Sequence, residues 1–465
     1  MSQKFDSIKL MDADGKVLQS ASTESKIYTR KIKGFFQRFR KVTLWLMMSA
    51  FFITCWIQID GQPLILFDIQ HSKYYVFGMV FWPQDFFLLA ILLIIAAFAL
   101  FFITTIFGRV WCGYTCPQTA WSFVFMWLEE RIEGSRNQRI KLDKAPMSVE
   151  KATKRVLKHA SWLLVAFITG FTFIAYFYPA RDLATEMFTA SFISIHQPLW
   201  IMFFTLATYI NAGWMREAVC MHICPYARFQ SVMFNHDTLL VAYDEKRGEP
   251  RGKNNKQDIS EGHCVDCELC VQVCPTGIDI RDGLQYECIG CALCIDACDS
   301  IMDKMNYEKG LIRYTTETEL EGGKTHFFRP RLIGYSLVLA IMITGFVYAM
   351  LSRTAVEIDV IRDRNSLYQP TPNDTFMNSY TLEMMNMSQG ELTYRISIEG
   401  LDAFTSNIPN KFTLHSNELR AFPITIDVDP TDLTVSKTNI EFIVIEEESN
   451  SEVAREESRF IAPLH

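Results

Sequence analysis

The stretch "CVDCELCVQVCP", residues 264–275, decides the fold of the central part of this chain. Its four cysteines follow the spacing C-x2-C-x2-C-x3-C-P, and "CIGCALCIDACD", residues 288–299, repeats the cysteine spacing. Three thiolates on one tight loop can cap three irons of a 4Fe–4S cube, while the fourth cysteine of each run serves the other cube. The two runs therefore predict two 4Fe–4S clusters on a small α+β module.

Zinc and disulfides are the two alternatives for these cysteines. Zinc takes cysteines in two pairs rather than in two triplets plus one, and disulfides are disfavoured if the segment is cytoplasmic. The runs resemble those of bacterial two-cluster ferredoxins. That resemblance implies one cluster on Cys264, Cys267, Cys270 and Cys298, and the other on Cys274, Cys288, Cys291 and Cys294. Asp299 stands where the pattern usually has a second proline, which concerns the geometry around Cys298 but removes no ligand.

Long apolar runs set the architecture around this module. The chain has 465 residues, of which 49% are hydrophobic, and its net charge of -7 gives no support to a nucleic-acid partner. Runs of about the length that crosses the hydrocarbon core predict five membrane spans, over 42–59, 86–107, 160–178, 199–214 and 332–351. Nothing before Arg30 is apolar enough for a cleavable signal peptide, so we expect the first span to be an uncleaved anchor.

Lysines and arginines near the span ends predict the orientation. They are dense in residues 30–41 and 131–158 and sparse in the 60–85 and 179–198 loops. We therefore expect the N-terminus and residues 215–331 in the cytoplasm and the C-terminal tail in the periplasm of a bacterial inner membrane.

A second cysteine motif occurs twice, each time after an even-numbered span. "GRVWCGYTCPQTAW", residues 108–121, and "MREAVCMHICPYARF", residues 215–229, both contain an arginine-led C-x3-C-P. Each proline suits the first position of a helix, with the cysteine just before it, where the helix dipole favours a thiolate. The membrane part is thus predicted to consist of two similar halves.

These repeated cysteines are candidates for a metal or redox site. If the two halves bring Cys112, Cys116, Cys220 and Cys224 together, four thiolates would suit Cu(I) or a further cluster; the alternative is structural packing. His222 could add an imidazole ligand, although a lone histidine at an interface is more often only hydrogen-bonded. Cys55, isolated in a span, is expected to be a small buried apolar residue.

The C-terminal tail shows the alternation of strands. "TYRISIEG", "NKFTLHS", "FPITIDVDP" and "NIEFIVIEEES" alternate apolar and polar residues with turn residues between them, which predicts an immunoglobulin-like sandwich. Met384, Met385 and Met387 could be a copper site outside the membrane, but methionines in strands usually serve packing.

The predicted fold is therefore multi-domain, with five parts. They are a cytoplasmic N-terminal tail over 1–41, a four-span membrane domain with the two half-repeats over 42–235, a cytoplasmic two-cluster ferredoxin domain over 236–331, a fifth transmembrane helix over 332–351, and a periplasmic all-β domain over 352–465.

This order of parts resembles the cytochrome c oxidase accessory family CcoG, also called FixG or RdxA, over nearly the whole chain. The resemblance implies assembly of a cbb(3)-type cytochrome c oxidase, with reduction of Cu(II) to Cu(I) during copper delivery. It also implies oxidase assembly factors and a copper chaperone or transporter as partners, besides the membrane lipid and an unknown cytoplasmic electron donor.

The resulting hypothesis is a metal-ion oxidoreductase in which two clusters relay electrons to Cu(II) held at or near the four C-x3-C-P thiols. No nucleotide-binding fingerprint is evident, so we expect a separate electron donor. Two alternatives stay open. The halves also resemble membrane ferredoxin subunits that pass electrons from quinol to a periplasmic respiratory enzyme, and the chain could instead be a non-catalytic scaffold for oxidase assembly.

Overall fold

The computed structural model describes residues 10–11, 17–18 and 26–463, apart from 60, 190, 193, 253–261, 327, 353–355, 364–365, 373, 388–389, 417 and 434. The chain divides into two compact units, Met1–Thr344 and Gly345–His465. The first unit contains all thirteen cysteines, which are free thiols. Two short strands, β1 (Leu10–Met11) and β2 (Val17–Leu18), pair near its start.

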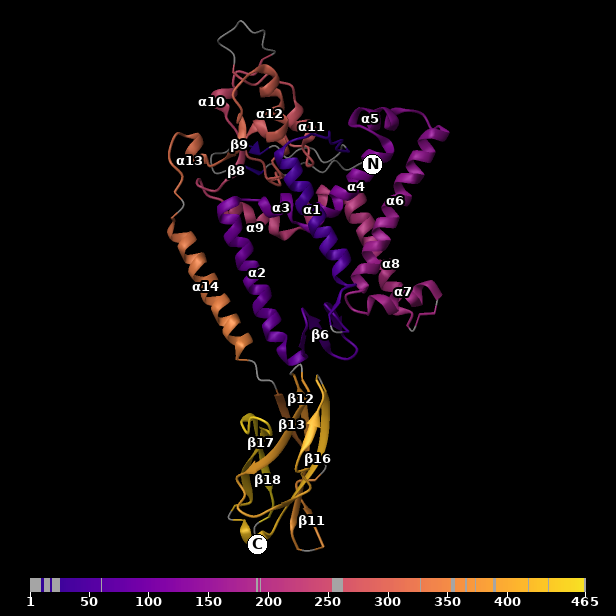
Figure 1. Ribbon diagram of the computed structural model, residues 1–465. Coiled ribbons are helices and arrows are strands. Elements are labelled where there is room, and N and C mark those ends of the chain that lie inside the picture. Colours follow the sequence, from indigo (N-terminus) through magenta and orange to yellow (C-terminus); the bar gives the residue numbers. More distant parts are fainter. Residues whose placement is uncertain are drawn as a thin grey trace, which may run out of the picture. The chain divides into compact units, whose positions relative to one another are not determined.

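Three helices are long and apolar enough to cross a membrane, among the residues that the structure describes. They are α2 (Phe86–Phe107) with the 3-10 turn Pro83–Asp85 before it, α6 (Val149–Ile174) and α14 (Pro330–Leu351) (Figure 1). Their lengths and apolar side chains are those of a membrane protein.

The other two expected spans take a different form. The helix α1 (Phe35–Thr54) has 20 residues, but its first turns carry Arg38, Arg40 and Lys41, and the chain leaves the helix at Cys55. The helix α8 (His196–Thr208) has 13 residues and then widens into a π-helix over Tyr209–Met215. Hydropathy predicts five spans because it counts apolar residues, whereas the structure gives three uninterrupted apolar helices.

The shorter elements of this unit lie between the long ones. On one side, β5 (Ile65–Asp68), β6 (Lys73–Val76) and β7 (Met79–Phe81) form an antiparallel sheet next to the hairpin of β3 (Gln58–Ile59) and β4 (Gln62–Pro63). The remaining short helices are α3 (Val110–Tyr114), α4 (Pro117–Glu133), α5 (Arg136–Lys144), α7 (Ala180–Thr189), the π-helix Val219–Ile223 and α9 (Pro225–Met233). Cys55 is buried in a cluster with Ile174 and Leu183, which confirms the apolar role predicted for it.

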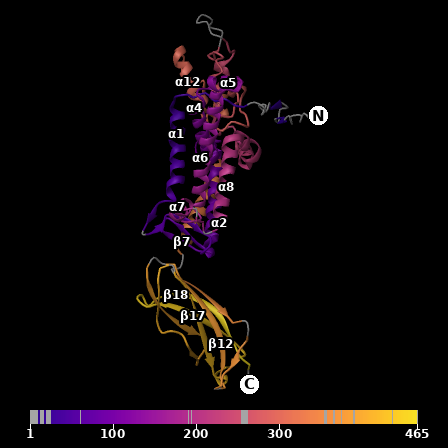
Figure 2. The same ribbon diagram turned by 90° about the vertical axis from the view of Figure 1, so that its right-hand side faces the viewer.

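Helices α4, α6 and α8 pack side by side (Figure 2). At the polar end of this group two carboxylates of α4 are fully buried. Glu129 accepts from Arg216 at 2.7 Å, and Glu133 pairs with Arg155 and Lys158, both at 2.9 Å. Arg155 and Lys158, two of the basic residues in 131–158 that predict the orientation, are therefore neutralised inside the protein.

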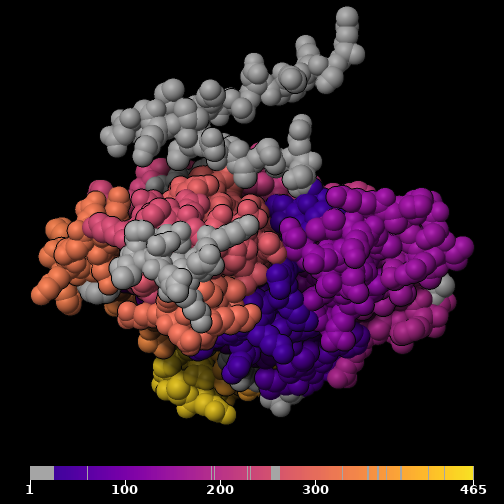
Figure 3. All heavy atoms as spheres, turned by 90° about the horizontal axis from the view of Figure 1, so that it is seen from above, coloured from indigo at the N-terminus to yellow at the C-terminus, as the bar shows by residue number. Residues whose placement is uncertain are grey.

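The ferredoxin module follows as a compact α+β insertion. Strands β8 (Leu240–Tyr243) and β9 (Ile312–Thr315) pair antiparallel. Around them lie α10 (Glu245–Gly248), α11 (Leu269–Val273), the 3-10 turn Ile280–Asp282, α12 (Leu293–Met305) and α13 (Glu317–Leu320). In Figure 3, which views the molecule from the end where the module lies, the indigo residues of α1 lie between the module and the purple helices α4 to α6.

One contact fixes α1 to this module. The helix begins after Gly34 without a side-chain cap of its own. Instead, the carboxylate of Asp296, in α12, accepts from the main-chain nitrogens of Phe36 at 3.2 Å and Gln37 at 2.7 Å. A Cβ at position 34 would overlap this carboxylate. The module therefore supplies the N-terminal cap of α1 from a distant part of the chain.

The second unit is a sandwich of two antiparallel sheets around one core. One sheet has the order β10 (Val356–Arg362), β12 (Phe376–Asn386), β16 (Leu419–Val428) and β14 (Thr405–Ser406), with β11 (Gln369–Pro370) beside β12. The other has β15 (Phe412–Leu414), β13 (Leu392–Glu399), β17 (Lys437–Glu446) and β18 (Glu452–Ile461). The four alternating runs correspond to β13, β15, β16 and β17, so these strands were predicted correctly. Met384 is fully buried in the core, which is the packing role.

Candidate functional site

The two cysteine triplets adopt the same backbone path. Two residues after the first cysteine the chain is left-handed in both loops, at Asp266 (φ 49°) and Gly290 (φ 65°). It is left-handed again directly before α11 and α12, at Glu268 (φ 54°) and Ala292 (φ 58°). Since L residues rarely adopt this conformation, its occurrence at four matching positions supports the predicted internal repeat.

Each loop lines a cavity of about 360 Å³. The first, the Cys264 cavity, is lined by Cys264, Cys267, Cys270 and Cys298. The second, the Cys288 cavity, is lined by Cys270, Cys274, Cys288, Cys291 and Cys294. Each cavity thus combines the triplet of one run with the fourth cysteine of the other, which is the grouping that the ferredoxin resemblance implies.

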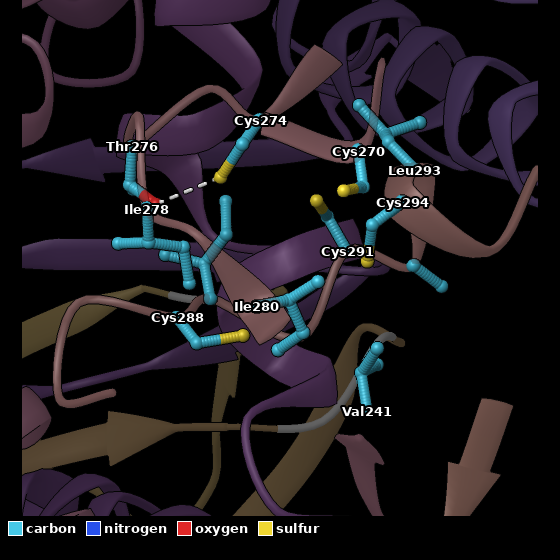
Figure 4. A pocket seen from close by; sticks show the side chains of 12 residues that line it. Val241, Cys270, Cys274, Thr276, Ile278, Ile280, Cys288, Cys291, Leu293 and Cys294 are labelled. Carbon is cyan, nitrogen blue, oxygen red and sulfur yellow. Dashed lines mark hydrogen bonds between the residues drawn. The ribbon is translucent and has the colours of Figure 1, made fainter. Parts of the chain in front are cut away.

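The thiols fit an iron–sulfur cluster better than a single ion. Within the described residues, no three His, Cys, Asp or Glu side chains come close enough together to hold one metal ion. Thiols at the corners of a four-iron cube lie farther apart than ligands around one tetrahedral zinc. In Figure 4 the sulfurs of the Cys288 cavity point into one space, whose other walls are apolar residues such as Ile278 and Ile280.

The surroundings keep these thiols protonated in the metal-free chain. Burial raises the pKa of Cys270, Cys288 and Cys298 to about 12 each. Since thiolates are the ligands, cluster binding to these residues must release protons.

The departure at Asp299 lengthens a helix and leaves the cavity intact. Without the second proline, α12 continues through Asp299 to Met305. The Asp299 carboxylate accepts from the main-chain nitrogen of Gly310 at 3.1 Å, and Cys298 still lines the Cys264 cavity.

The two C-x3-C-P motifs end in the predicted way. Cys116 is the N-cap of α4 and Cys224 is the N-cap of α9, with Pro117 and Pro225 at the first helical position. Cys112 lies in α3 and Cys220 in the π-helix Val219–Ile223, so the halves differ in local conformation. π-helical turns are rare in proteins, and those that occur are often found at functional sites.

The halves bring the four thiols into one neighbourhood. Burial and the nearby thiol of Cys116 raise the pKa of Cys112 to about 12, and Cys220 and Cys224 act on it in the same direction. The Cys112 thiol also lies 3.6 Å from the amide oxygen of Gln230. The four do not form a preassembled single-ion site, and His222 is exposed.

Residues 112–116, which we call the Cys112 loop, pack directly on residues 288–294 of the ferredoxin module, which we call the Cys291 loop. A Cβ at Gly113 would lie 3.0 Å from both the Cα atom of Cys291 and the carbonyl oxygen of Ile289. The Tyr114 hydroxyl donates to the carbonyl of Cys291 at 3.2 Å. The two loops therefore touch through backbone atoms.

Arg109 is a residue of this contact to which sequence analysis gave no role. This residue is 7% exposed, and its guanidinium donates to the carbonyls of Tyr286 and, at 3.3 Å, Cys288 in the module. It also donates to Ala227, in the second half, at 2.8 Å. The arginine that precedes the cysteine motif was the available signal, and its role is to join both halves to the Cys288 cavity.

A further cavity links the second half to the module. It has about 390 Å³, and Cys220 and Glu217 line it together with Pro275 and Thr276. The Thr276 hydroxyl lies 3.3 Å from the Cys274 sulfur. Both halves thus approach the Cys288 cavity rather than the Cys264 cavity.

Family models match three parts of the chain. Residues 215–317 match a 4Fe–4S dicluster domain, and residues 89–132 match a 4Fe–4S binding domain. Residues 346–463 match a model described as an Ig-like fold at the C-terminus of FixG, a putative oxidoreductase. Ferredoxin-type domains on apolar helices, joined to an immunoglobulin-like domain, define a membrane-type iron–sulfur electron-transfer protein.

Relatives extend over most of the chain. The nitrogen fixation protein FixG of Rhizobium meliloti is 36% identical over 89% of this chain and 85% of its own length. The protein RdxA of Cereibacter sphaeroides is 38% identical over 80% of this chain and 82% of its own length. A crystal structure of a FixG-related protein from Vibrio parahaemolyticus covers 24% of this chain and all of its own, at 28% identity and a TM-score of 0.23. The chain belongs to the FixG/RdxA family, which confirms the predicted resemblance.

Proposed function

We propose that this protein is a membrane cupric reductase that converts Cu(II) to Cu(I) for the assembly of a cbb(3)-type cytochrome c oxidase. The contact between the Cys112 loop and the Cys291 loop carries the proposal. It joins a candidate copper site to a candidate cluster site through the backbone atoms of Gly113 and Cys291.

In this proposal the eight ferredoxin cysteines hold two clusters. Those of the Cys264 cavity hold one, and Cys274, Cys288, Cys291 and Cys294 hold the other. When bound, the clusters supply one-electron transfer. The buried charge of Arg109 faces the Cys288 carbonyl and would stabilise negative charge on that side of the module.

The arrangement gives electron flow a direction. Cys267 is exposed at the Cys264 cavity, and this is the side where a soluble donor would deliver its electron. The Cys288 cavity adjoins Cys112 and Cys220, the side from which the electron leaves. Each Cu(II) accepts one electron and becomes Cu(I), which thiolate ligands favour.

Sidedness and partners are part of the same proposal. The module faces the cytoplasm and its donor, and the Ig-like domain faces the periplasm and the oxidase assembly factors. The helix α1 and the combination of α8 with its π-helical continuation would provide two more crossings. A copper chaperone or transporter would receive or supply the metal.

The test measures the bound copper and the bound iron of the same variant separately. Anaerobically purified protein with Cys112→Ala/Cys116→Ala should lose bound copper, keep its iron, and reoxidise slowly when Cu(II) is added after reduction. The matched control is Cys55→Ala, a buried cysteine outside both motifs. Normal reoxidation by Cu(II) in the double variant would refute the copper site.

A second candidate for the four thiols is a further cluster. The match of residues 89–132, which include Cys112 and Cys116, to a 4Fe–4S binding domain favours it. Iron that falls together with copper in the double variant would identify this alternative. Reduced wild-type protein that Cu(II) fails to reoxidise would instead favour the quinol-linked or scaffold functions.

A further inference from the structure

A basic cavity has no cysteine in its lining, although it shares Arg40, Met126 and Pro275 with the cavity that contains Cys220. It has about 620 Å³ of space, part of it open to solvent, and five walls: residues 29–32, α1, α4, α5 and the ferredoxin module. Its cationic lining residues are Arg30, Lys31, Arg40, Lys41 and Arg139, and its carboxylate lining residue is Glu130. We propose that this cavity binds the phosphate headgroup of an acidic phospholipid, with phosphatidylglycerol as the probe.

Residues 26–33, which we call the strap, build the outer wall. The main-chain nitrogen of Arg30 donates to the carbonyl of Gln272 in the module at 2.8 Å. On the other side Arg136, in α5, donates to the carbonyl of Tyr28 at 2.9 Å. The strap is thus held from two sides, by the module and by α5.

The cations of the cavity outnumber the carboxylates that face them. Lys31 lies 3.6 Å from Glu130, and Arg139 lies 3.7 Å from the buried Glu129 behind the wall. Arg40 uses its Nε to donate to the Gly113 carbonyl at 3.1 Å. By contrast, the cations around Glu133 are paired inside the protein. A surplus of positive charge in a recess between helices is the usual receptor for a lipid phosphate.

Among the residues that the structure describes, two buried polar atoms of lining side chains lack a hydrogen-bond partner. The Nε of Arg139, a residue 3% exposed, has no hydrogen-bond acceptor, and the Oε1 of Gln37 has no donor. Both atoms are closed to solvent, so a phosphate oxygen or a glycerol hydroxyl would reach them only after a small movement of the lining side chains.

The cavity lies where α1 changes from charged to apolar. Directly after Lys41 the helix exposes Val42 by 59% and Leu46 by 67%. Trp45 forms an edge-to-face pair with Trp127, another lining residue, at 6.0 Å between ring centroids. Lys, Arg and Trp at such a transition mark the headgroup level of a bilayer. A lipid is therefore favoured over a soluble phosphate.

The experiment measures lipid retention by the full-length protein with native mass spectrometry. Lys31→Gln/Lys41→Gln removes two lining charges, and Lys33→Gln/Arg38→Gln removes two exposed charges of the same segment that do not line the cavity. We expect at least a tenfold loss of phosphatidylglycerol in the first variant only. Lys41→Glu should give the same loss independently.

Two further arms identify the source of the phosphate. Phosphatidylethanolamine should be retained equally by all variants, and soluble glycerol phosphate should not displace the lipid. Equal retention of phosphatidylglycerol by both double variants would overturn the proposal, and so would its displacement by glycerol phosphate. These readouts need no copper and no reduction, so they are independent of the reductase proposal.

Discussion

The hydroxyl of Tyr114 and the carbonyl of Cys291 are joined by a hydrogen bond of 3.2 Å. Tyr114 belongs to the first C-x3-C-P motif, and Cys291 to the second ferredoxin run. Two motifs that are far apart in the chain thus meet.

The grouping of the cysteines can be tested with paired substitutions. Cys298→Ala and Cys267→Ala should remove the same cluster, about four irons of eight, and the two changes together should remove no more. Cys298→Ala/Cys274→Ala should remove both clusters, because these residues line different cavities. Iron and sulfide analysis with electron paramagnetic resonance checks the counts; Cys55→Ala is the control. If Cys298→Ala and Cys294→Ala each removed the same cluster, the grouping would be wrong.

The tight contact at Gly113 predicts a steric cost. Gly113→Ala should destabilise the docked module by about 1–3 kcal/mol, because the neighbouring atoms are backbone and cannot move aside easily. The measurement is the thermal midpoint of loss of iron–sulfur absorbance. Gly334→Ala, where a Cβ meets nothing within 4 Å, should leave the midpoint unchanged. Equal midpoints in both variants would contradict the docking.

The cap of α1 predicts a smaller effect. Asp296→Ala should cost about 1 kcal/mol, since two main-chain nitrogens lose their acceptor, and Asp296→Asn should recover most of it. Asp303→Ala removes an exposed carboxylate of the same helix, which pairs with Lys309, and should cost almost nothing. Thermal unfolding of the three variants checks the order, and a cost for Asp303→Ala as large as that for Asp296→Ala would argue against the cap.

Sidedness predicts the behaviour of fusion reporters. A reporter that is active only outside the cytoplasm should be active after Ser366 and silent after Asn254, because positive charges stay inside. The reverse result would place the thiols of the module in an oxidising compartment.

Local patterns in the sequence predicted much of the candidate site. The spacing of cysteines restricts which thiols one loop can present, so the triplets were recognisable. Pro117 and Pro225 marked helix starts because proline lacks an amide hydrogen. Strand alternation identified the sandwich for a similar reason, since its period is a property of each strand alone.

Such local patterns could not predict contacts between segments that are far apart in the chain. Nothing near Asp296 in the sequence indicates that it caps a helix more than two hundred residues earlier, and the partners of Arg109 lie in segments remote from it. The expected spans at α1 and α8 failed to appear as uninterrupted apolar helices for a related reason. A count of apolar residues does not register charged residues in the first turns of a helix or a change to π-helical hydrogen bonding.

The close fit around Gly113 has a consequence for the order of biogenesis. The ribosome delivers the first C-x3-C-P motif well before the residues of the module, and domains tend to fold as they emerge. The surface that later receives Cys291 therefore stays uncovered until the module has been synthesised. In the proposed reductase, the path from the clusters to copper would be complete only after this late segment has docked.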